Sequence, residues 1–372
     1  MKKKVLVTGG AGFIGSYICE QLLAHGYQVR VIDNLEHQVH FGKKPDYEFL
    51  NHVDFVEKDV SSPQIWAEVL EDVDAIIHEA AAVGVGQSQY QIAHYCNTNV
   101  MGTAQMLDYM ANNKHKVGKI IVAASMSSYG EGRYINSEKE IVRPSLRSEE
   151  DVRKHGWEPK CPKTGSNLIA QPTQETDERV PNSIYASNKM TQEDLIHSFG
   201  RAYGIPTVAL RYFNVYGPRQ SLSNPYTGVL SIFTSRLKNN RSPVIYEDGK
   251  QTRDFVHVKD IAKANMLALE SENAAGESFN IASGTHRTIY SVAQTMAEVL
   301  HKDIGPEVTE KFRKGDVRHC FADIQKAQKT LGYQPSANFE NGLEEIANWS
   351  ETMKAEDKFD EATKELRQRG LV

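Results

Sequence analysis

The sequence predicts an α/β protein built on a doubly wound parallel sheet, with a smaller α/β lobe interleaved with it. Three observations support this fold class. Short apolar runs rich in β-branched residues alternate with helical patterns, a glycine-rich turn directly follows the first run, and the alternation changes in character after Arg211. No internal repeat is visible.

The strand–helix alternation occupies the first two-thirds of the chain. Buried parallel strands are short apolar runs, and we expect them at Val5–Val7, Val29–Ile32, Val53–Val56, Ala75–Ile77, Lys119–Ala123 and Thr207–Leu210. Helical spacing is found at Gly12–His25, Asn97–Asn112 and Ser187–Tyr203. After Arg211 we expect a strand at Pro243–Tyr246 and helices at Tyr226–Leu237, Val258–Leu269 and Ile289–Leu300.

These elements divide the chain into a larger first domain, residues 1–211, and a smaller lobe, residues 212–372. The segment at about 243–262 is expected to return to the first domain. A polar stretch at about 131–181, rich in charge and proline, has no clear periodicity. Loops of that length usually bind something or cap a site, so we expect an insertion over the substrate side; the alternative is a mobile surface excursion.

Composition excludes several functional classes. The net charge is −5 and no basic stretch exceeds the lysines at positions 2–4, so nucleic acid is not an expected partner. No segment approaches the roughly 18 apolar residues that span a bilayer, and no signal peptide is recognisable. Scattered cysteines without pair spacing favour a reducing cytoplasm: Cys19, Cys96, Cys161 and Cys320.

A glycine pattern predicts a dinucleotide site. Gly9, Gly12 and Gly15 lie between a predicted strand and a predicted helix. Small residues are needed there because the backbone turns tightly and the pyrophosphate approaches the helix N-terminus. Asp33 ends the next strand, where a carboxylate binds the adenosine ribose and repels a 2′-phosphate, so NAD is favoured over NADP.

A tyrosine and a lysine four residues apart predict the catalytic base. Tyr185 and Lys189 lie on one face of the predicted helix. Because free tyrosine has a pKa near 10, the positive charges of Lys189 and of the oxidised nicotinamide are needed to favour its phenolate. Ser125, just past a predicted strand, can bridge the same substrate oxygen. His78 and Glu79 are expected to be structural.

These motifs resemble the extended short-chain dehydrogenase/reductase family, whose members act on nucleotide sugars, and the resemblance covers nearly the whole chain. It rests on Thr8–Gly15, Asp33-Asn34, Ser125–Gly130, Tyr185–Lys189 and Arg211–Pro218. The resemblance implies a Rossmann-type sheet with Tyr185 as the base, Lys189 as its modulator and Ser125 as its hydrogen-bonding partner. The expected NAD contacts are Gly9, Gly12, Phe13, Ile14, Gly15, Asp33, Asn34, Asp59, Val60, Ala80, Ala81, Ala82, Asn99, Tyr185 and Lys189.

The resemblance also implies contacts to the substrate. Asn214 and Arg253 correspond to ligands of the diphosphate. Tyr246 corresponds to a residue packed against the nucleotide base, and Arg318 to a phosphate or ribose contact. Ser127 joins them beside the sugar. An arginine fork matches phosphate oxygens, although any one of these arginines alone could form a surface ion pair.

Among the reactions of the family, C4 epimerisation through a 4-keto intermediate fits best. A 4,6-dehydratase needs an additional acid and base, which that group carries as Asp-Glu after its serine or threonine, whereas this chain has Met126-Ser127. Asp33 disfavours an NADPH-dependent reductase, and no sign of a decarboxylase is found. A non-catalytic NAD-binding protein remains an alternative, although Tyr185 and Lys189 are both present.

Three segments resemble the dTDP-L-rhamnose 4-epimerases more than the UDP-hexose 4-epimerases, which stay as the alternative: Ala82–Ser88, Ser125–Gly132 and Ser223–Val229. Apolar Val83 and Met126 suit a 6-deoxy sugar. Cys161 retains one thiol of a knuckle found in relatives, too few ligands for structural zinc, so we expect no metal. The resemblance further implies a homodimer formed through Asn97–Asn112 and Ser187–Tyr203.

Overall fold

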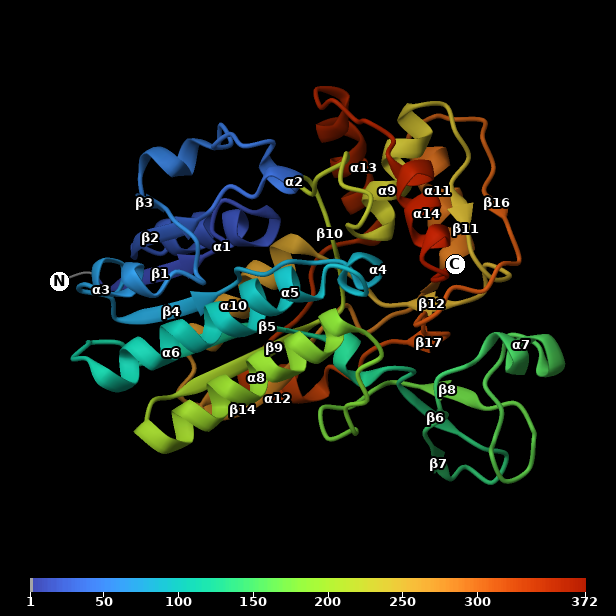
Figure 1. Ribbon diagram of the computed structural model, residues 1–372, viewed down its shortest axis with the longest axis horizontal. Helices are drawn as coiled ribbons and strands as arrows, with labels where there is room; N and C mark the ends of the chain where they lie inside the picture. Colours follow the sequence, from blue (N-terminus) through green and yellow to red (C-terminus); the bar gives the residue numbers. More distant parts are fainter. Residues whose placement is uncertain (1–2) are drawn as a thin grey trace.

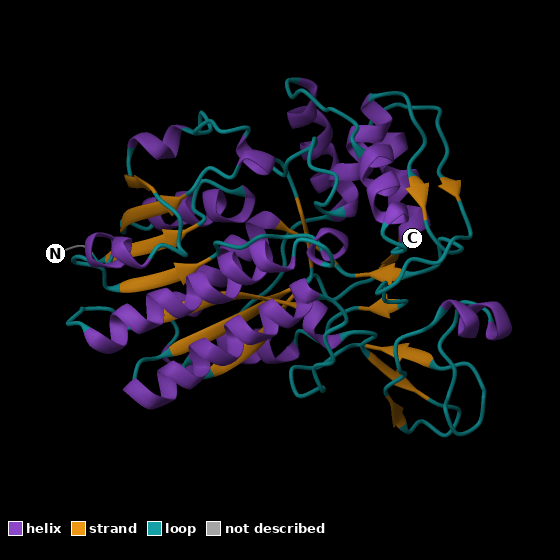
Figure 2. Cartoon of the chain, in the orientation of Figure 1, coloured by secondary structure: helices purple, strands orange, loops and turns teal. Residues whose placement is uncertain are grey.

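The computed structural model describes residues 3–372, and its centre is a seven-stranded parallel sheet (Figures 1 and 2). The strand order is β14-β9-β5-β4-β1-β2-β3. The strands are β1 (Lys4–Thr8), β2 (Gln28–Asp33), β3 (Asp54–Glu57), β4 (Ala75–His78), β5 (Ile120–Ser125), β9 (Thr207–Tyr212) and β14 (Glu277–Ile281). All six predicted strands are present within two residues of their expected bounds, and the predicted fold class is confirmed.

The seventh strand, β14, was missed in the sequence. Its apolar run is interrupted by Ser278 and Asn280, so it does not read as a buried strand. In the structure Asn280 is fully buried, and both polar atoms of its side chain have partners. The Tyr129 hydroxyl donates to its Oδ1 at 2.7 Å, and its Nδ2 donates to the Thr173 carbonyl at 2.9 Å. Satisfied hydrogen bonds let a polar residue occupy a core strand.

Helices cover both faces of the large sheet. α1 (Phe13–Ala24) and α10 (Val258–Glu270) pack together on one face, with α12 (Gln325–Leu331) beside β14. The other face carries α3 (Trp66–Val69), α5 (Ile92–Tyr95), the π-helical η3 (Cys96–Met101), α6 (Gly102–Asn112) and α8 (Ile184–Tyr203). α8 begins three residues before its predicted start, since the Ser183 hydroxyl caps it by accepting from the Ala186 amide.

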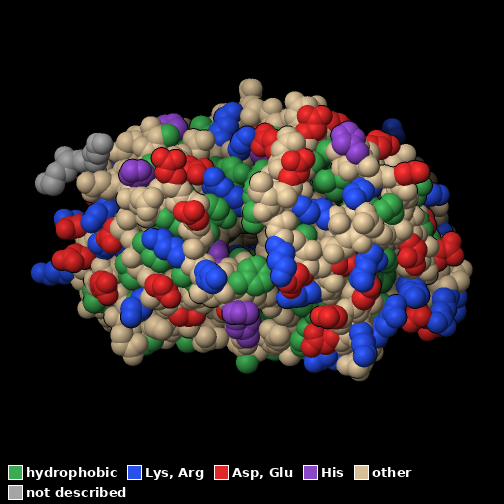
Figure 3. Space-filling view, turned by 90° about the horizontal axis from the view of Figure 1, so that it is seen from above, with side chains coloured by type: hydrophobic (Ala, Val, Ile, Leu, Met, Phe, Trp, Pro, Cys, Tyr) green, Lys and Arg blue, Asp and Glu red, His purple; other side chains and the backbone are tan. Residues whose placement is uncertain are grey.

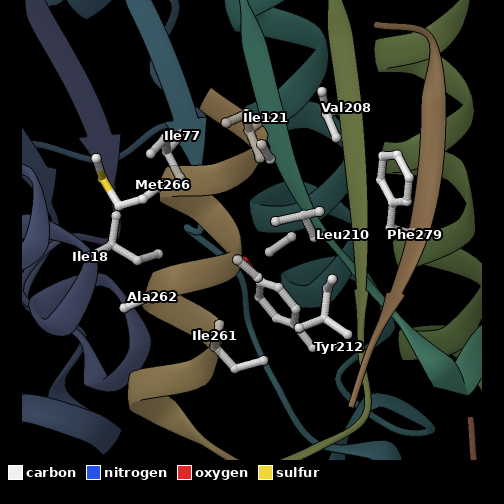
Figure 4. Packing of buried hydrophobic residues seen from close by; sticks show 14 of the residues in the cluster. Ile18, Ile77, Ile121, Val208, Leu210, Tyr212, Ile261, Ala262, Met266 and Phe279 are labelled. Atoms are coloured by element: carbon white, nitrogen blue, oxygen red, sulfur yellow. The ribbon is translucent and has the colours of Figure 1, made fainter. Parts of the chain in front are cut away.

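The core under α1 and α10 is continuous with the apolar strands (Figure 4). Ile18 of α1 and Met266 of α10 face Ile77, Ile121 and other strand residues, and all of these side chains are buried. Both faces of the strands are covered, which explains why they read as unbroken apolar runs and not as alternating ones.

The smaller lobe is interleaved with the large sheet. It contains α9 (Val229–Lys238), α11 (Ile289–Val299), α13 (Phe339–Glu351) and α14 (Phe359–Gln368). Its short strands pair as β10 (Asn214–Tyr216) with β13 (Phe255–His257) and β11 (Val244–Ile245) with β16 (Glu307–Val308). In a third small sheet, β12 (Thr252–Arg253) pairs with both β15 (Arg287–Thr288) and β17 (His319–Cys320). Between these elements the chain returns to the large sheet as α10 and β14 (Figure 1).

The helix expected at Tyr226–Leu237 begins later, at Val229. The Asn224 side chain accepts from the Tyr226 amide at 3.0 Å and holds the preceding residues in a turn. The remaining short helical elements are α2 (His37–His40), η1 (Glu48–Asn51), η2 (Pro63–Ile65), α4 (Val85–Ser88), η4 (Met126–Tyr129) and η5 (Glu272–Ala274).

The polar insertion folds as a small unit at the lower right of Figure 1. It consists of β6 (Arg133–Ile135), β7 (Ile141–Val142), β8 (Ile169–Gln171) and α7 (Glu149–His155). Tyr134, Cys161 and Leu168 form its buried cluster. Strands of two or three residues are too short to show periodicity, which explains why the sequence revealed no elements here.

Buried ion pairs join this insertion to the smaller lobe. Arg147 binds Glu131 at 3.0 Å and Glu247 at 2.8 Å, and all three side chains are almost completely buried. Arg318 binds Glu247 from the other side at 2.8 Å. The insertion is therefore held by charge pairs from which water is largely excluded. Among residues 3–372, no helix is both long and apolar enough to cross a bilayer, and no cluster could hold a metal ion.

We predict that Arg147→Met destabilises the protein by about 3–5 kcal/mol, because it leaves the buried carboxylates of Glu131 and Glu247 without this partner. Denaturant unfolding measures this loss. Arg153→Met is the matched control in the same insertion, since the exposed Arg153–Glu149 pair should contribute less than about 1 kcal/mol. Equal stability of the two variants would contradict the structural role of Arg147.

Candidate active site

The glycine pattern forms a close turn between β1 and α1. Gly9 has a φ of +67°, and a Cβ on Gly15 would lie 2.2 Å from the Gly9 carbonyl oxygen. Gly12 caps α1, and Phe13 and Ile14 form its first turn. At Gly9 and Gly15 this turn therefore requires glycine. The first amides of a helix such as α1 can bind an anion at its N-terminus.

Asp33 ends β2 beside this turn, with its carboxylate held by the backbone. It accepts hydrogen bonds from the amides of Ala11 at 3.1 Å and Leu35 at 2.9 Å, and His40 Nε2 lies 3.8 Å away. Burial raises the pKa of Asp33, while His40 and the backbone amides oppose that shift. The carboxylate thus lies where a ribose of a dinucleotide on the glycine turn would reach it, and the residues present fit NAD.

The adenosine-side residues predicted from the sequence form a connected group. Asn34 Nδ2 donates to Asp59 at 2.8 Å, and Asp59 also accepts from the amide and hydroxyl of Ser61. Val60 is buried against Gly102, where a Cβ would approach it to 2.7 Å. The structure therefore brings the ends of β2 and β3 together.

The run Ala80–Ala82 follows β4 and is held from both ends. The Thr8 hydroxyl accepts from the Ala80 amide at 3.1 Å. Asn99 is fully buried and makes two hydrogen bonds with the backbone of Ala82, at 2.8 and 3.1 Å. Asn99 thus shapes the edge of the predicted cofactor site through the backbone.

The proposed catalytic residues meet at the carboxyl edge of β5. Ser125 ends β5, and Tyr185 lies in the first turn of α8, where the Ser125 hydroxyl lowers the pKa of its phenol. Lys189 is buried and its Nζ donates to the Ala123 carbonyl at 2.9 Å. The Ser88 hydroxyl of α4 accepts from the Tyr185 amide at 3.1 Å. The structure thus brings Ser88 and Ser125, from distant parts of the sequence, to the Tyr185–Lys189 pair.

Burial dominates the electrostatics of this group. It raises the pKa of Tyr185 to about 12, which the hydrogen bond from Ser125 opposes. It lowers the pKa of Lys189 to about 8, which the carboxylate of Glu79 opposes. Tyr185 therefore needs additional positive charge nearby before it can act as a base at neutral pH.

Of the predicted substrate residues, Ser127 lies in η4 and the others lie in the smaller lobe. The Ser127 hydroxyl donates to Ser125 Oγ at 2.9 Å. Asn214 Oδ1 is buried without a hydrogen-bond partner within residues 3–372. The Arg253 guanidinium donates to the carbonyls of Val317 and Arg318 at 2.6 and 3.1 Å.

Arg318 has partners that the sequence did not indicate. Its side chain is completely buried and bound by Glu158, Glu247 and Asp248 at 2.6–2.8 Å. Its guanidinium is therefore committed to carboxylates, one of them from the insertion. Arg313, which was missed, lies 5.0 Å from the ring centre of Tyr246 and has a side chain that is 40% exposed.

A cavity of about 310 Å³ lies beside Tyr246, between β11 and α14. Thr309, Lys311, Lys364 and Arg367 contribute to its lining. Figure 3 shows that the surface seen from above is also hollowed near its middle. The lining thus places cations and the carboxylates of Glu307 and Asp360 beside the Tyr246 ring.

The C-terminal helix α14 connects both parts of the molecule at this site. Glu365 accepts hydrogen bonds from the hydroxyls of Tyr90 and Tyr226 at 2.9 and 3.0 Å. Tyr90 follows α4, whereas Tyr226 precedes α9. The same helix lines the cavity beside Tyr246.

Two family models match this chain. The model of the NAD dependent epimerase/dehydratase family matches residues 5–150, and that of GDP-mannose 4,6 dehydratase matches residues 165–346. The dTDP-L-rhamnose 4-epimerase of Burkholderia thailandensis is 34% identical over 349 residues, which cover 93% of this chain and 94% of the relative. The chain belongs to the NAD-dependent epimerase/dehydratase family.

Solved structures of family members share the fold over most of their length. The UDP-glucose 4-epimerase of Thermotoga maritima, determined with UDP-glucose, has a TM-score of 0.77 and 30% identity, covering 94% of this chain and 98% of its own. The UDP-glucuronic acid 4-epimerase of Bacillus cereus, in complex with UDP-glucuronic acid and NAD, has a TM-score of 0.75 and 27% identity, covering 94% and 100%. This chain is therefore an NAD-dependent nucleotide-sugar epimerase of the extended short-chain dehydrogenase/reductase type.

We predict that Gly15→Ala weakens NAD binding at least about tenfold, which corresponds to about 1.4 kcal/mol. The added Cβ would meet the Gly9 carbonyl at 2.2 Å, and only a backbone shift of the turn relieves that contact. Calorimetric titration with NAD measures the effect. Gly118→Ala is the control, because its Cβ meets only the Asp74 carbonyl at 3.8 Å. Unchanged affinity in Gly15→Ala would place the dinucleotide elsewhere.

Proposed function

We propose that the protein interconverts the C4 epimers of a nucleotide sugar, with Tyr185 as the acid–base residue. The observation that carries this proposal is the group at the end of β5. The Ser125 hydroxyl lowers the pKa of Tyr185, and Lys189 is anchored to the Ala123 carbonyl one helical turn away. The glycine turn and Asp33 belong to neighbouring strands of the same sheet edge.

In the first half-reaction, Tyr185 accepts the proton of the sugar 4-hydroxyl while Ser125 hydrogen-bonds to the same oxygen. NAD, when bound, supplies the oxidant for C4 and returns the hydride. The Ala123 carbonyl holds the Lys189 ammonium beside the phenolate. Its positive charge opposes the rise that burial causes in the pKa of Tyr185. The 4-keto sugar then turns over in the pocket, and Tyr185 returns the proton to the oxygen.

The side chains around Ser125 favour epimerisation over dehydration. Elimination of water would need an additional acid and base near the sugar. Met126 and Ser127 occupy the two positions after Ser125, and the Ser127 hydroxyl is bound to Ser125. No carboxylate follows Ser125 in η4.

We propose dTDP-L-rhamnose as the substrate, with dTDP-6-deoxy-L-talose as the product. The similarity to the Burkholderia thailandensis enzyme supports this choice. Val83, which is 53% exposed, and the partly buried Met126 flank the cofactor edge and suit a methyl group at C6. The second candidate is a UDP-hexose, because the Thermotoga maritima structure contains UDP-glucose.

For the nucleotide we propose Tyr246 and Arg313 as the contacts to the base and diphosphate, together with Asn214 and Arg253. Arg313 is accessible and lies over the Tyr246 ring, whereas Arg318 is buried among carboxylates. We therefore assign Arg318 to the support of this loop and not to the ligand.

We also propose a homodimer formed through η3, α6 and α8. Met101 is 44% exposed on η3, and Val100, Tyr109, Met190 and Leu195 are partly exposed on these helices. Such apolar side chains on two adjacent helices suit a helical interface. Light scattering after size exclusion tests this, with Met101→Glu as the disrupting variant; a monomeric unchanged protein would reject it.

We predict that Tyr185→Phe lowers the epimerisation rate by about 10²–10⁴, the range for loss of an acid–base group. Bound NAD should be retained, because the glycine turn and Asp33 are untouched. Tyr203→Phe is the control at the exposed end of α8. Full activity of Tyr185→Phe would show that another group is the base.

We predict that dTDP-L-rhamnose is converted by the purified protein saturated with NAD. A proton NMR time course should show a second sugar spin system with altered H4 couplings. A static spectrum with dTDP-L-rhamnose, together with turnover of UDP-glucose under the same conditions, would select the second candidate.

A further inference from the structure

Two loops of the smaller lobe carry residues that we assigned to the nucleotide, and both loops touch the insertion. Tyr246 directly follows β11, and Arg313 lies between β16 and β17. The insertion reaches both loops with the side chain of Arg147, which is only 5% exposed. A buried guanidinium that contacts two loops can fix their positions relative to each other.

The loop of Arg313 is held through its backbone. Arg147 Nη2 donates to the Asp316 carbonyl at 3.2 Å, and the Asp316 carboxylate pairs with Arg313 at 2.8 Å. Glu131, at the start of the insertion, accepts from the Arg318 amide at 2.6 Å. Two backbone groups of this loop are therefore bound by buried side chains of the insertion.

The loop of Tyr246 is held through the next residue, Glu247. The Glu247 carboxylate pairs with Arg147 at 2.8 Å and with Arg318 at 2.8 Å, and its side chain is almost completely buried. The Glu247 backbone has a φ of +55°, a left-handed conformation that residues with a Cβ rarely adopt. Because this turn comes directly after Tyr246, the two arginines that hold Glu247 also fix the direction in which the chain leaves Tyr246.

We propose that Glu247 and Arg147 are positioning residues for the nucleotide. Glu247 acts through Tyr246, to which it is joined, and Arg147 also acts through the loop of Arg313. Their buried ion pair maintains the arrangement in which the Arg313 guanidinium lies 5.0 Å from the centre of the Tyr246 ring. This inference rests on the proposed function and deepens it, because it gives the insertion a part in nucleotide binding.

The chemistry of this ion pair suits a rigid support. Arginine stays charged at working pH, and breaking a buried pair leaves a charge without compensation. Glu247 and Arg147 therefore separate only at a high energetic cost, and Tyr246 keeps its position before a ligand arrives. A site that is already ordered loses less conformational entropy on binding, which raises its affinity.

The first test is calorimetric titration of the NAD-saturated protein with dTDP and with UDP. For the nucleotide that binds more tightly, we expect Glu247→Gln to weaken the affinity about tenfold, which corresponds to about 1.4 kcal/mol. The affinity for NAD, titrated separately, should stay unchanged. Glu149→Gln is the matched control, because its carboxylate lies in the same insertion but pairs with Arg153 in an exposed position. Unchanged nucleotide affinity in Glu247→Gln, or an equal loss of NAD affinity, would overturn the inference.

A double-mutant cycle with Tyr246 separates positioning from a general loss of structure. Tyr246→Ala should weaken nucleotide binding by itself. In a protein that already carries Tyr246→Ala, adding Glu247→Gln should change the affinity by less than about twofold, because the ring that Glu247 positions is gone. Losses that simply add would contradict the inference.

Glu247→Gly covers the case in which Glu247→Gln folds poorly. Glycine adopts a positive φ without strain but supplies no carboxylate to the arginines. The nucleotide affinity of Glu247→Gly should therefore fall as well, and retained affinity would contradict the inference.

Failure of the proposed nucleotide site gives a different result from failure of this inference. If neither dTDP nor UDP binds, or if Tyr246→Ala leaves the affinity unchanged, the nucleotide contacts are wrong and the inference falls with them. If Tyr246→Ala weakens binding and Glu247→Gln does not, the inference alone is rejected.

The second test uses whichever nucleotide sugar is turned over. A change that removes only binding raises KM and leaves kcat unchanged. Glu247→Gln should therefore raise KM about tenfold with little change in kcat, because Tyr185, Lys189 and Ser125 are untouched. A lower kcat with an unchanged KM would contradict the inference.

Discussion

The hydrogen bond from Lys189 Nζ to the Ala123 carbonyl is the contact on which the catalytic geometry depends. It fixes α8 against β5 at the step where Ser125 completes the strand. Because Lys189 is only 4% exposed, its charge acts on Tyr185 with little screening by water. Without this anchor, a tyrosine and a lysine four residues apart would be an ordinary pair on a helix surface.

The parallel sheet explains why the other groups converge on the same place. The carboxyl ends of β1, β2, β4 and β5 carry the glycine turn, Asp33, Glu79 and Ser125. A ligand lying across these ends meets all of them at once. In the smaller lobe, α14 bonds to tyrosines from both parts of the chain. This helix therefore ties the smaller lobe to the loop that follows α4.

Local motifs made the sheet and the catalytic residues predictable. Glycine spacing, buried apolar runs and the Tyr185–Lys189 spacing are all short-range signals, and the structure assembles them as expected. β14 was not predicted because it contains the polar residue Asn280. The side-chain hydrogen bonds that let Asn280 be buried come from partners more than 40 residues away in the sequence. Arg318 was predicted as a ligand contact, and its carboxylate partners, Glu158 among them, could not be foreseen because they lie at least 70 residues away.

The central claim is that C4 itself gives up and regains a hydride while Tyr185 moves only the hydroxyl proton. The most direct measurement is the fate of deuterium placed at C4 of dTDP-L-rhamnose, followed by NMR in ordinary water. The account predicts that the deuterium remains at C4 in both epimers when equilibrium is reached. Exchange of the C4 label with solvent during epimerisation would contradict it.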